Sequence, residues 1–219
     1  MSDGDNSVGG EAVGGPQPLP AGPTEAHASV PEAAGHLGQK AAARKARVAT
    51  IWLEGCSGCH MSFLDMDERL IDLAEKIDLV YSPLVDFKEC PPDVDVTLVE
   101  GGVATDGDVR KMRKIRARTK VLISLGDCAV TGNVPSMRNS LDIADVYDRA
   151  YVENAHTQRQ RPATRLPVLL ERVRPVHELV KVDVHIPGCP PPADAIHYVL
   201  TELLAGRTPD ISKVTRFGR

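Results

Sequence analysis

Four of the five cysteines lie in glycine-containing turns, and they are the residues of this chain best suited to chemistry. Cys56 and Cys59 form a Cys-x-x-Cys pair, whereas Cys128 and Cys189 each stand alone far downstream. Zinc and iron–sulfur clusters are both bound by thiolates. A zinc ribbon pairs two close cysteines with two more, and only one close pair is present here, which disfavours a ribbon. Four thiolates held in fixed positions suit a 4Fe–4S cluster. The alternatives are a structural zinc ion, and four buried thiols that act only as small apolar side chains.

Glycines stand beside these cysteines, at positions 55, 58, 126 and 188. Glycine lets backbone N–H groups approach closely, and such donors can hydrogen-bond to cluster sulfur atoms. Prolines at 190–192 follow Cys189 and stiffen that segment. Cys90 lies apart from this pattern in a proline-rich turn, and we expect it to be a loop thiol without a ligand role.

The elements that must position the cysteines alternate between strands and helices. Apolar runs predict strands at 48–53, 77–81, 94–99, 120–125 and 180–186, and helical spacing predicts helices at 62–76, 106–119 and 190–204. This alternation predicts an α/β fold with a doubly wound, flavodoxin-like parallel sheet. The cysteines follow the first, fourth and fifth strands, so they should meet at the carboxyl edge, where open sheets bind ligands.

Two segments interrupt this rhythm. Residues 1–45 are rich in Gly and Pro, and we expect a disordered N-terminal tail before a single domain at 46–219. Residues 134–179 are too long for a plain loop, so they form either an insertion with its own short helices or a partner-contact segment. We slightly favour the partner contact.

Composition excludes several classes of protein. The 219 residues carry 26 Lys and Arg against 30 Asp and Glu, a net charge of −4, which argues against a dedicated nucleic-acid binder. The three Phe, four Tyr and one Trp are too few for a base-stacking surface. No apolar run approaches the roughly 18 residues of a membrane span, and the N-terminus lacks the features of a secretory signal.

Three motifs in order resemble the small subunit of nickel–iron hydrogenases, and most closely the soluble, bidirectional NAD-reducing type. They are EGCSGCH at 54–60, GDCAVTGN at 126–133 and PGCPP at 187–191, within a resemblance that covers about residues 46–205. The resemblance implies a flavodoxin-like fold with one proximal 4Fe–4S cluster bound by Cys56, Cys59, Cys128 and Cys189. The related 20 kDa subunit of respiratory complex I has adjacent cysteines in the first motif, so the spacing here favours a hydrogenase.

The resemblance also implies partners. A large subunit would hold the nickel–iron centre, and electrons would pass through this chain to diaphorase iron–sulfur and flavin subunits that reduce NAD. The chain stops soon after Cys189 and has no twin-arginine leader, which suits the short cytoplasmic type. Two other interpretations stay open: a cytoplasmic nickel–iron complex with a different electron acceptor, and a zinc-stabilised binding module without redox function.

Some individual features carry alternatives. FMN can bind flavodoxin-like folds, but Cys56 and Cys59 occupy the turn where a flavodoxin holds phosphate, which disfavours FMN in this chain. Glu54 is a candidate for proton transfer at the subunit interface, or simply caps its turn. The basic segment 111–120 is typical of a solvated helix face, with a docking surface for the diaphorase partner as the alternative.

Overall fold

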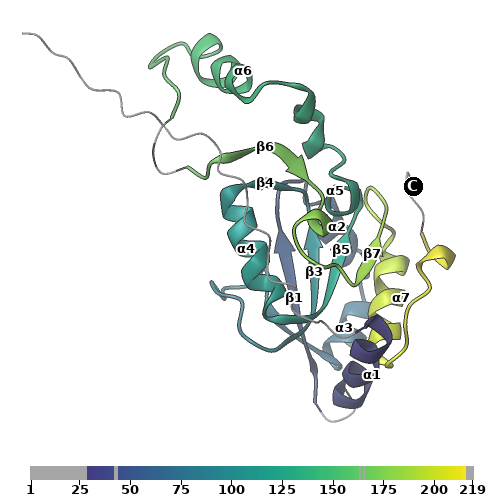
Figure 1. The fold of residues 1–219 in the computed structure, drawn as a ribbon. Coiled ribbons are helices and arrows are strands. Elements are labelled where there is room, and N and C mark those ends of the chain that lie inside the picture. The colour runs from purple at the N-terminus through teal and green to yellow at the C-terminus, as the bar shows by residue number, and fades with distance from the viewer. Residues whose placement is uncertain (1–28, 42–43, 163, 165, 216–219) are drawn as a thin grey trace, which may run out of the picture.

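A five-stranded parallel sheet forms the centre of the computed structural model, which describes residues 29–41, 44–162, 164 and 166–215. The strand order is β2-β1-β3-β5-β7, and every neighbouring pair is parallel. The strands are β1 Ala46–Trp52, β2 Ile77–Tyr81, β3 Val94–Glu100, β5 Thr119–Leu125 and β7 Val184–Ile186. The predicted doubly wound, flavodoxin-like fold is confirmed (Figure 1).

Helices cover both faces of this sheet, as the buried strand sequences require. The helices α1 Val30–Ala41, α2 Gly58–Leu64, α3 Arg69–Ala74 and α7 Ala193–Leu204 pack on one face, and α4 Asp106–Arg116 packs on the other. Residues of β5 alternate between the two cores, with Val121 and Ile123 on the α7 side and Leu122 on the α4 side. A short helix, α5 Asp127–Thr131, follows β5 at the carboxyl edge.

The first predicted helix, 62–76, is wrong as a single element. Helix α2 begins four residues earlier, at Gly58, and ends at Leu64. Asp67 then takes a left-handed conformation with φ 50°, which ends the helical path before α3 begins at Arg69. The early start of α2 places Cys59 inside the first turn of a helix.

Other predicted boundaries also move, most of them by one to four residues. The last sheet strand begins at Val184 rather than at residue 180. Asp183 precedes it, accepts a hydrogen bond from the Leu122 amide at 2.8 Å, and forms a buried ion pair with Arg116 at 2.6 Å. Helix α4 ends at Arg116 rather than at residue 119. This ion pair therefore joins the end of α4 to the start of β7.

The predicted disorder of residues 1–45 is wrong for residues 30–41, which form α1. Ala34 and Leu37 of this helix are fully buried in the core beside α7. Gly38 of the same helix packs against Gly206 where a larger side chain would not fit, which composition alone did not reveal. The first 28 residues of the predicted tail lie outside the described residues.

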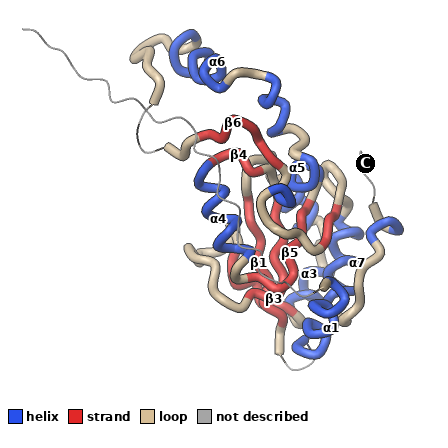
Figure 2. The backbone as a smooth tube through the Cα atoms, viewed as in Figure 1, coloured by secondary structure: helices blue, strands red, loops and turns tan. Residues whose placement is uncertain are grey.

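The segment 134–179 contains short elements of its own. It contains η1 Pro135–Ser140, α6 Ile143–Asp148, the π-helical η2 Arg149–Glu153, β6 Leu169–Arg174 and η3 Val176–Glu178. Strand β6 pairs antiparallel with β4 Val103–Thr105 as a separate ribbon. Helix α6 lies beyond this ribbon, away from the main sheet (Figures 1 and 2).

The remaining described element is η4 Ile211–Lys213, which follows α7. None of the helices in the described part of the chain is long and apolar enough to cross a membrane.

Helix α1 docks through a close backbone contact that gives the first testable prediction. A Cβ atom at Gly38 would lie 2.7 Å from the Gly206 backbone, so Gly38→Ala should lower the free energy of unfolding by about 1–3 kcal/mol. At Gly35 a Cβ meets no described atom within 4 Å, so Gly35→Ala should raise it by about 0.5–1 kcal/mol. Urea denaturation monitored by circular dichroism measures both. Equal stabilisation by the two substitutions would contradict the docked position of α1.

Candidate metal centre

The four predicted cysteines line one pocket at the carboxyl edge of the sheet. Cys56 lies in the turn after β1, Cys59 in α2, Cys128 in α5, and Cys189 in the turn between β7 and α7. Cys56 and Cys59 belong to one segment of the chain, so three segments that are far apart in sequence surround a pocket of about 70 Å³. The prediction that parallel strand ends bring the cysteines together is confirmed as a matter of geometry.

The four thiols divide into two inner and two outer groups. Cys59 and Cys128 are 7% and 9% exposed, whereas Cys56 and Cys189 are exposed to solvent. Within the described ranges, no three His, Cys, Asp or Glu side chains converge tightly enough to hold a single metal ion. The thiols are thus arranged around a pocket whose outer side opens to the surface.

The three turns that carry the pocket are numbered here in chain order: the first follows β1, the second follows β5 and the third follows β7. Gly126 allows the first and second turns to approach each other. It has φ +82°, a conformation that side chains disfavour, and a Cβ atom there would overlap the Cys59 sulfur. Its amide also donates to the Ile186 carbonyl at 2.8 Å, which ties the end of β5 to the end of β7. Glycine is therefore required at this position by both backbone conformation and space.

Asp127 holds the second and third turns together. Its carboxylate accepts a hydrogen bond from the Gly188 amide at 2.7 Å, and its own amide donates to the Gly188 carbonyl at 2.9 Å. This pair of bonds fixes the position of Cys189 relative to Cys128. Asp127 was not among the predicted site residues, although its place in the motif beside Cys128 could have marked it.

Glu100 holds the first turn and was also missed. It ends β3, lies 3% exposed, and accepts hydrogen bonds from the His60 amide at 2.9 Å and from His60 Nδ1 at 2.5 Å. The Trp52 ring contacts His60 edge-on, with ring centroids 5.2 Å apart. An acidic residue directly after the apolar pair Leu98 and Val99, at the end of a predicted strand, was the available signal. Glu100 therefore anchors α2 directly after Cys59.

Electrostatics in the pocket disfavour four free thiolates. Burial is the main cause that raises the pKa of Cys59, and Glu100 and the other three pocket cysteines raise it further. Burial likewise raises the pKa of Cys128, with Cys189 and Cys56 adding to the effect. Cysteines bind metals in the deprotonated thiolate form. A positively charged metal group would therefore offset the mutual repulsion of the four thiolates.

Hydrogen-bond donors surround the sulfur atoms. The Gly58 amide donates to Cys56 Sγ at 3.4 Å, and Asn133 Nδ2 donates to Cys189 Sγ at 3.5 Å. A hydrogen bond from the Val134 backbone lowers the pKa of Cys128 and so opposes the effect of its burial. N–H donors of this kind stabilise thiolates and tune the reduction potential of iron–sulfur clusters. The donor set, the pocket and the charge balance all fit a cluster bound by four thiolates.

Two residues considered in the sequence analysis, Cys90 and Glu54, do not line the cysteine pocket. Cys90 is 4% exposed and packs in the core on the α4 side, with residues such as Val94 and Ile115, so it does not line the pocket. Glu54 is exposed, and its backbone exchanges hydrogen bonds of 3.1 and 2.7 Å with Gly102. The main chain of Glu54 thus fixes the turn before Cys56, while its side chain stays at the surface.

Comparison with known proteins places this geometry in context. Residues 56–203 match the family described as NADH ubiquinone oxidoreductase, 20 Kd subunit. The NAD-reducing hydrogenase HoxS subunit delta of Cupriavidus necator is 44% identical over 179 residues, which cover 79% of this chain and 86% of that protein. A subunit of the F420-non-reducing hydrogenase of Methanothermobacter marburgensis is 39% identical over 169 residues, 75% of this chain. This chain covers only 55% of that protein's length.

A solved structure gives the same picture. The crystal structure of an NAD+-reducing NiFe hydrogenase in the H2-reduced state contains a chain with a TM-score of 0.76 and 40% sequence identity. The match covers 80% of this chain and 99% of that chain.

The division into inner and outer thiols predicts their reactivity in metal-free, reduced protein. Iodoacetamide at pH 8 should modify the exposed Cys56 and Cys189 at least about tenfold faster than Cys59, because burial raises the pKa of Cys59 and the thiolate is the reactive form. The raised pKa keeps the Cys59 thiol mostly protonated at both pH 8 and pH 9. Its thiolate fraction, and therefore its rate of modification, should rise about tenfold between these two pH values.

Peptide mass spectrometry over time measures each rate, and the buried Cys90 serves as a slow internal reference. Equal rates at Cys59 and Cys189 in protein that is folded by circular dichroism would contradict the arrangement.

Proposed function

Because the chain belongs to the family of the 20 kDa subunit of NADH ubiquinone oxidoreductase, with hydrogenase subunits among its relatives, we propose that it is the small, electron-transferring subunit of a nickel–iron hydrogenase. It carries electrons between a large subunit that holds the nickel–iron centre and partners that reduce NAD. The relative named as an NAD-reducing hydrogenase subunit, matched over 86% of its length, supports NAD as the acceptor.

The observation that carries this proposal is the convergence of Cys56, Cys59, Cys128 and Cys189 on one pocket. We propose that these four residues bind one 4Fe–4S cluster. When bound, the cluster supplies one-electron transfer. The protein's own contribution is positional: Glu100 anchors the first turn and Asp127 joins the other two, so the sulfur atoms keep their places.

The outer side of the pocket suits contact with a partner. Cys56 and Cys189 reach the surface, and exposed apolar side chains stand near the motif cysteines in sequence. Met61 is 58% exposed, Val134 is 58% exposed and Met137 is 73% exposed. Exposed apolar groups mark protein–protein contacts where they form a contiguous patch. We propose that the large subunit covers this side and that the insertion 134–179 contributes to the contact.

Two alternatives rest on separate observations. The F420-non-reducing hydrogenase relative favours a nickel–iron complex with a different electron acceptor. A zinc-stabilised binding module needs only the four thiols.

We place the complex in the cytoplasm, with diaphorase iron–sulfur and flavin subunits as further partners. FMN in this chain stays disfavoured, because the turn after β1 carries Cys56.

Metal content tests the proposed centre. Anaerobically purified protein should contain about four iron atoms and absorb broadly near 400 nm. Cys59→Ser should remove at least about half of the iron because one of four ligands is lost, whereas Cys90→Ser should retain it. Elemental analysis and electron paramagnetic resonance of the reduced protein measure the loss. One tightly bound zinc ion without iron would reject the cluster. Hydrogen-dependent reduction of NAD by the purified complex would distinguish NAD from a different electron acceptor.

The close approach at Gly126 gives a second test that leaves every cysteine in place. Gly126→Ala should force the Cys59 sulfur out of position and strain the backbone by about 1–3 kcal/mol, so the variant should bind less iron. Gly107→Ala is the control, because a Cβ there makes only ordinary contacts, the nearest at 3.5 Å. Full iron content in folded Gly126→Ala protein would show that this turn does not set the cysteine geometry.

A further inference from the structure

Asn133 reaches a sulfur atom of the cysteine pocket although it is not one of the residues that line this pocket. Its Nδ2 donates to Cys189 Sγ at 3.5 Å, and a thiolate can only accept such a bond. The Gly58 and Val134 donors to the other sulfur atoms are backbone amides. Among these three donors, Asn133 is therefore the one whose hydrogen bond depends on the identity of its side chain.

The bond from Asn133 to Cys189 favours the reduced form of a cluster at this site. Reduction transfers one electron from the partner subunit to the cluster, which adds one negative charge to the site. An N–H donor stabilises a charged acceptor more strongly than a neutral one, so the bond strengthens as the sulfur gains charge. Hydrogen bonds to the sulfur atoms are among the factors that set the potential of a cluster. Asn133 should therefore raise the reduction potential.

The backbone around Asn133 has a conformation that suits few residues. Asn133 has φ 27°, in the left-handed region that Asn and Asp adopt more readily than most residues with a Cβ atom. Gly132 before it ends α5 with φ 90°. These two residues turn the chain out of α5 and into η1, and the donor side chain stands at the bend.

Ser136 in η1 fixes Asn133 from the other side. Ser136 Oγ donates to the Asn133 carbonyl at 2.7 Å, and the Ser136 amide reaches the same carbonyl and that of Gly132, each at 3.1 Å. A Cβ atom at Gly132 would lie 3.0 Å from Ser136 Cβ, so the two turns are in close contact. The exposed Val134 and Met137 belong to the same segment. A partner that contacts them would act on the turn that carries the donor.

We propose that Asn133 raises the reduction potential of the cluster by donating to Cys189, and that Ser136 is the residue that positions it. The start of the segment 134–179 thereby couples contact with a partner to the potential of the centre. This inference rests on the proposed 4Fe–4S cluster and adds to it two residues that do not bind iron. A partner that excludes water would strengthen the bond, because hydrogen bonds are stronger in a medium of low dielectric constant.

Substitutions at Asn133 test the bond directly. Asn133→Asp keeps the shape of the side chain and the tolerance for a positive φ, but replaces the N–H donor with a carboxylate oxygen. One-electron reduction should become about tenfold less favourable, which lowers the midpoint potential by about 59 mV. Asn133→Gly removes the donor without adding charge and should also lower the potential. Redox titration of the full-length, anaerobically purified protein, followed by electron paramagnetic resonance, measures both.

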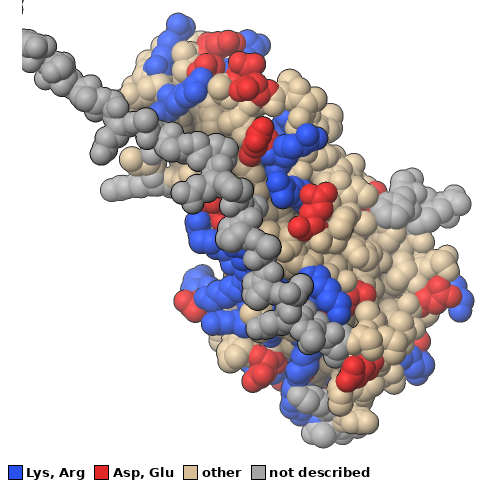
Figure 3. Space-filling view, in the orientation of Figure 1, with Lys and Arg blue, Asp and Glu red and all other residues tan. Residues whose placement is uncertain are grey.

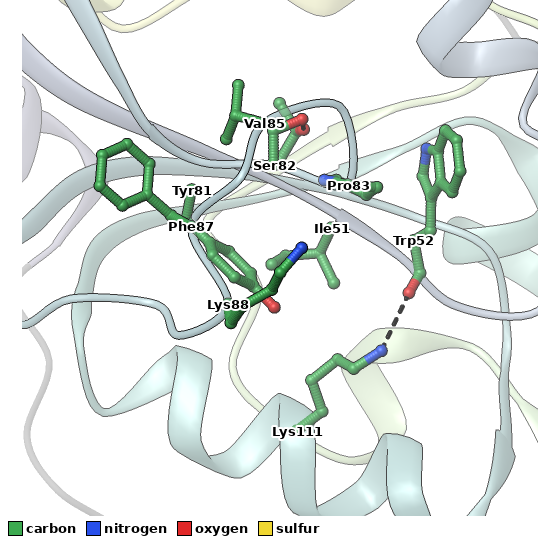
Figure 4. Close-up of a pocket in the computed structure, with 10 residues that line it drawn as sticks. Ile51, Trp52, Tyr81, Ser82, Pro83, Val85, Phe87, Lys88 and Lys111 are labelled. Atoms are coloured by element: carbon green, nitrogen blue, oxygen red, sulfur yellow. Dashed lines mark hydrogen bonds between the residues drawn. The ribbon is translucent and has the colours of Figure 1, made fainter.

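A charge control lies at the same edge of the sheet. Lys111 belongs to the basic helix α4, on the left of the molecule (Figure 3). It lines a second pocket, of about 330 Å³, at the carboxyl ends of β1 and β2, and donates to the Trp52 carbonyl at 3.3 Å (Figure 4). This pocket shares no lining residue with the cysteine pocket. Lys111→Met changes the net charge by the same amount as Asn133→Asp, but should change the reduction equilibrium less than about twofold because the exposed charge is screened.

Two serines of η1 test the positioning role. Ser136→Ala removes the 2.7 Å bond to the Asn133 carbonyl and should make reduction about threefold less favourable. Ser140→Ala is the matched control, because Ser140 Oγ donates to the Met137 carbonyl at 3.2 Å in the same element and makes no bond to Asn133. This control should keep the potential of the unsubstituted protein. An unchanged potential in Ser136→Ala would overturn the role of Ser136.

Iron content separates the failure of this inference from the failure of the proposed function. Unchanged potentials in Asn133→Asp and Asn133→Gly proteins with full iron content, or an equal shift in Lys111→Met, would overturn the tuning role and leave the cluster in place. Loss of iron from both Asn133 variants would show that Asn133 holds the cluster rather than tunes it. Absence of iron from the unsubstituted protein would overturn the proposed function, and this inference with it.

Discussion

The contact between the Gly126 backbone and the Cys59 sulfur is the constraint on which the rest of the site depends. It requires that the turns after β1 and β5 almost touch, although β3 lies between these strands in the sheet. Glu100 at the end of β3 bridges this interval by binding His60, and Asp127 extends the connection to β7 by binding Gly188. Four adjacent parallel strands thus contribute to one junction. A parallel sheet makes this possible because its carboxyl ends lie on one edge.

Charge distinguishes the two pockets of that edge. The cysteine pocket gathers four thiols and Glu100, and the raised pKa values of Cys59 and Cys128 show that negative charge is unfavourable there without a counter-ion. The pocket between β1 and β2 holds Lys88 and Lys111 without an acidic lining residue. The turn after β1 separates them, with Trp52 lining one pocket and Cys56 the other. One edge therefore presents two pockets of different charge, and the cysteine pocket is the one suited to a positively charged metal group.

Much of this arrangement could be predicted from the sequence, because apolar runs locate buried strands and parallel pairing places the residues that follow them together. The strand Ile77–Tyr81 and the meeting of the four cysteines follow from those two rules. Three features do not. The left-handed Asp67 breaks a well-patterned helix, and α1 is stabilised by tertiary packing of small residues. Glu100 is buried through a partner in another segment, which local pattern cannot show.

The asymmetry of the cysteine pocket argues that this chain works as part of a larger assembly. The proposed cluster would need to lie near the surface facing its partner, and Cys56 and Cys189 lie at the surface while Cys59 and Cys128 are buried. Such an opening in an isolated chain would admit water and leave apolar side chains, including Met61 and Met137, exposed to solvent. A partner that covers this opening would exclude water from the outer thiols. Exclusion of water changes the potential of an iron–sulfur centre, so the partner would complete the site electrically as well as sterically.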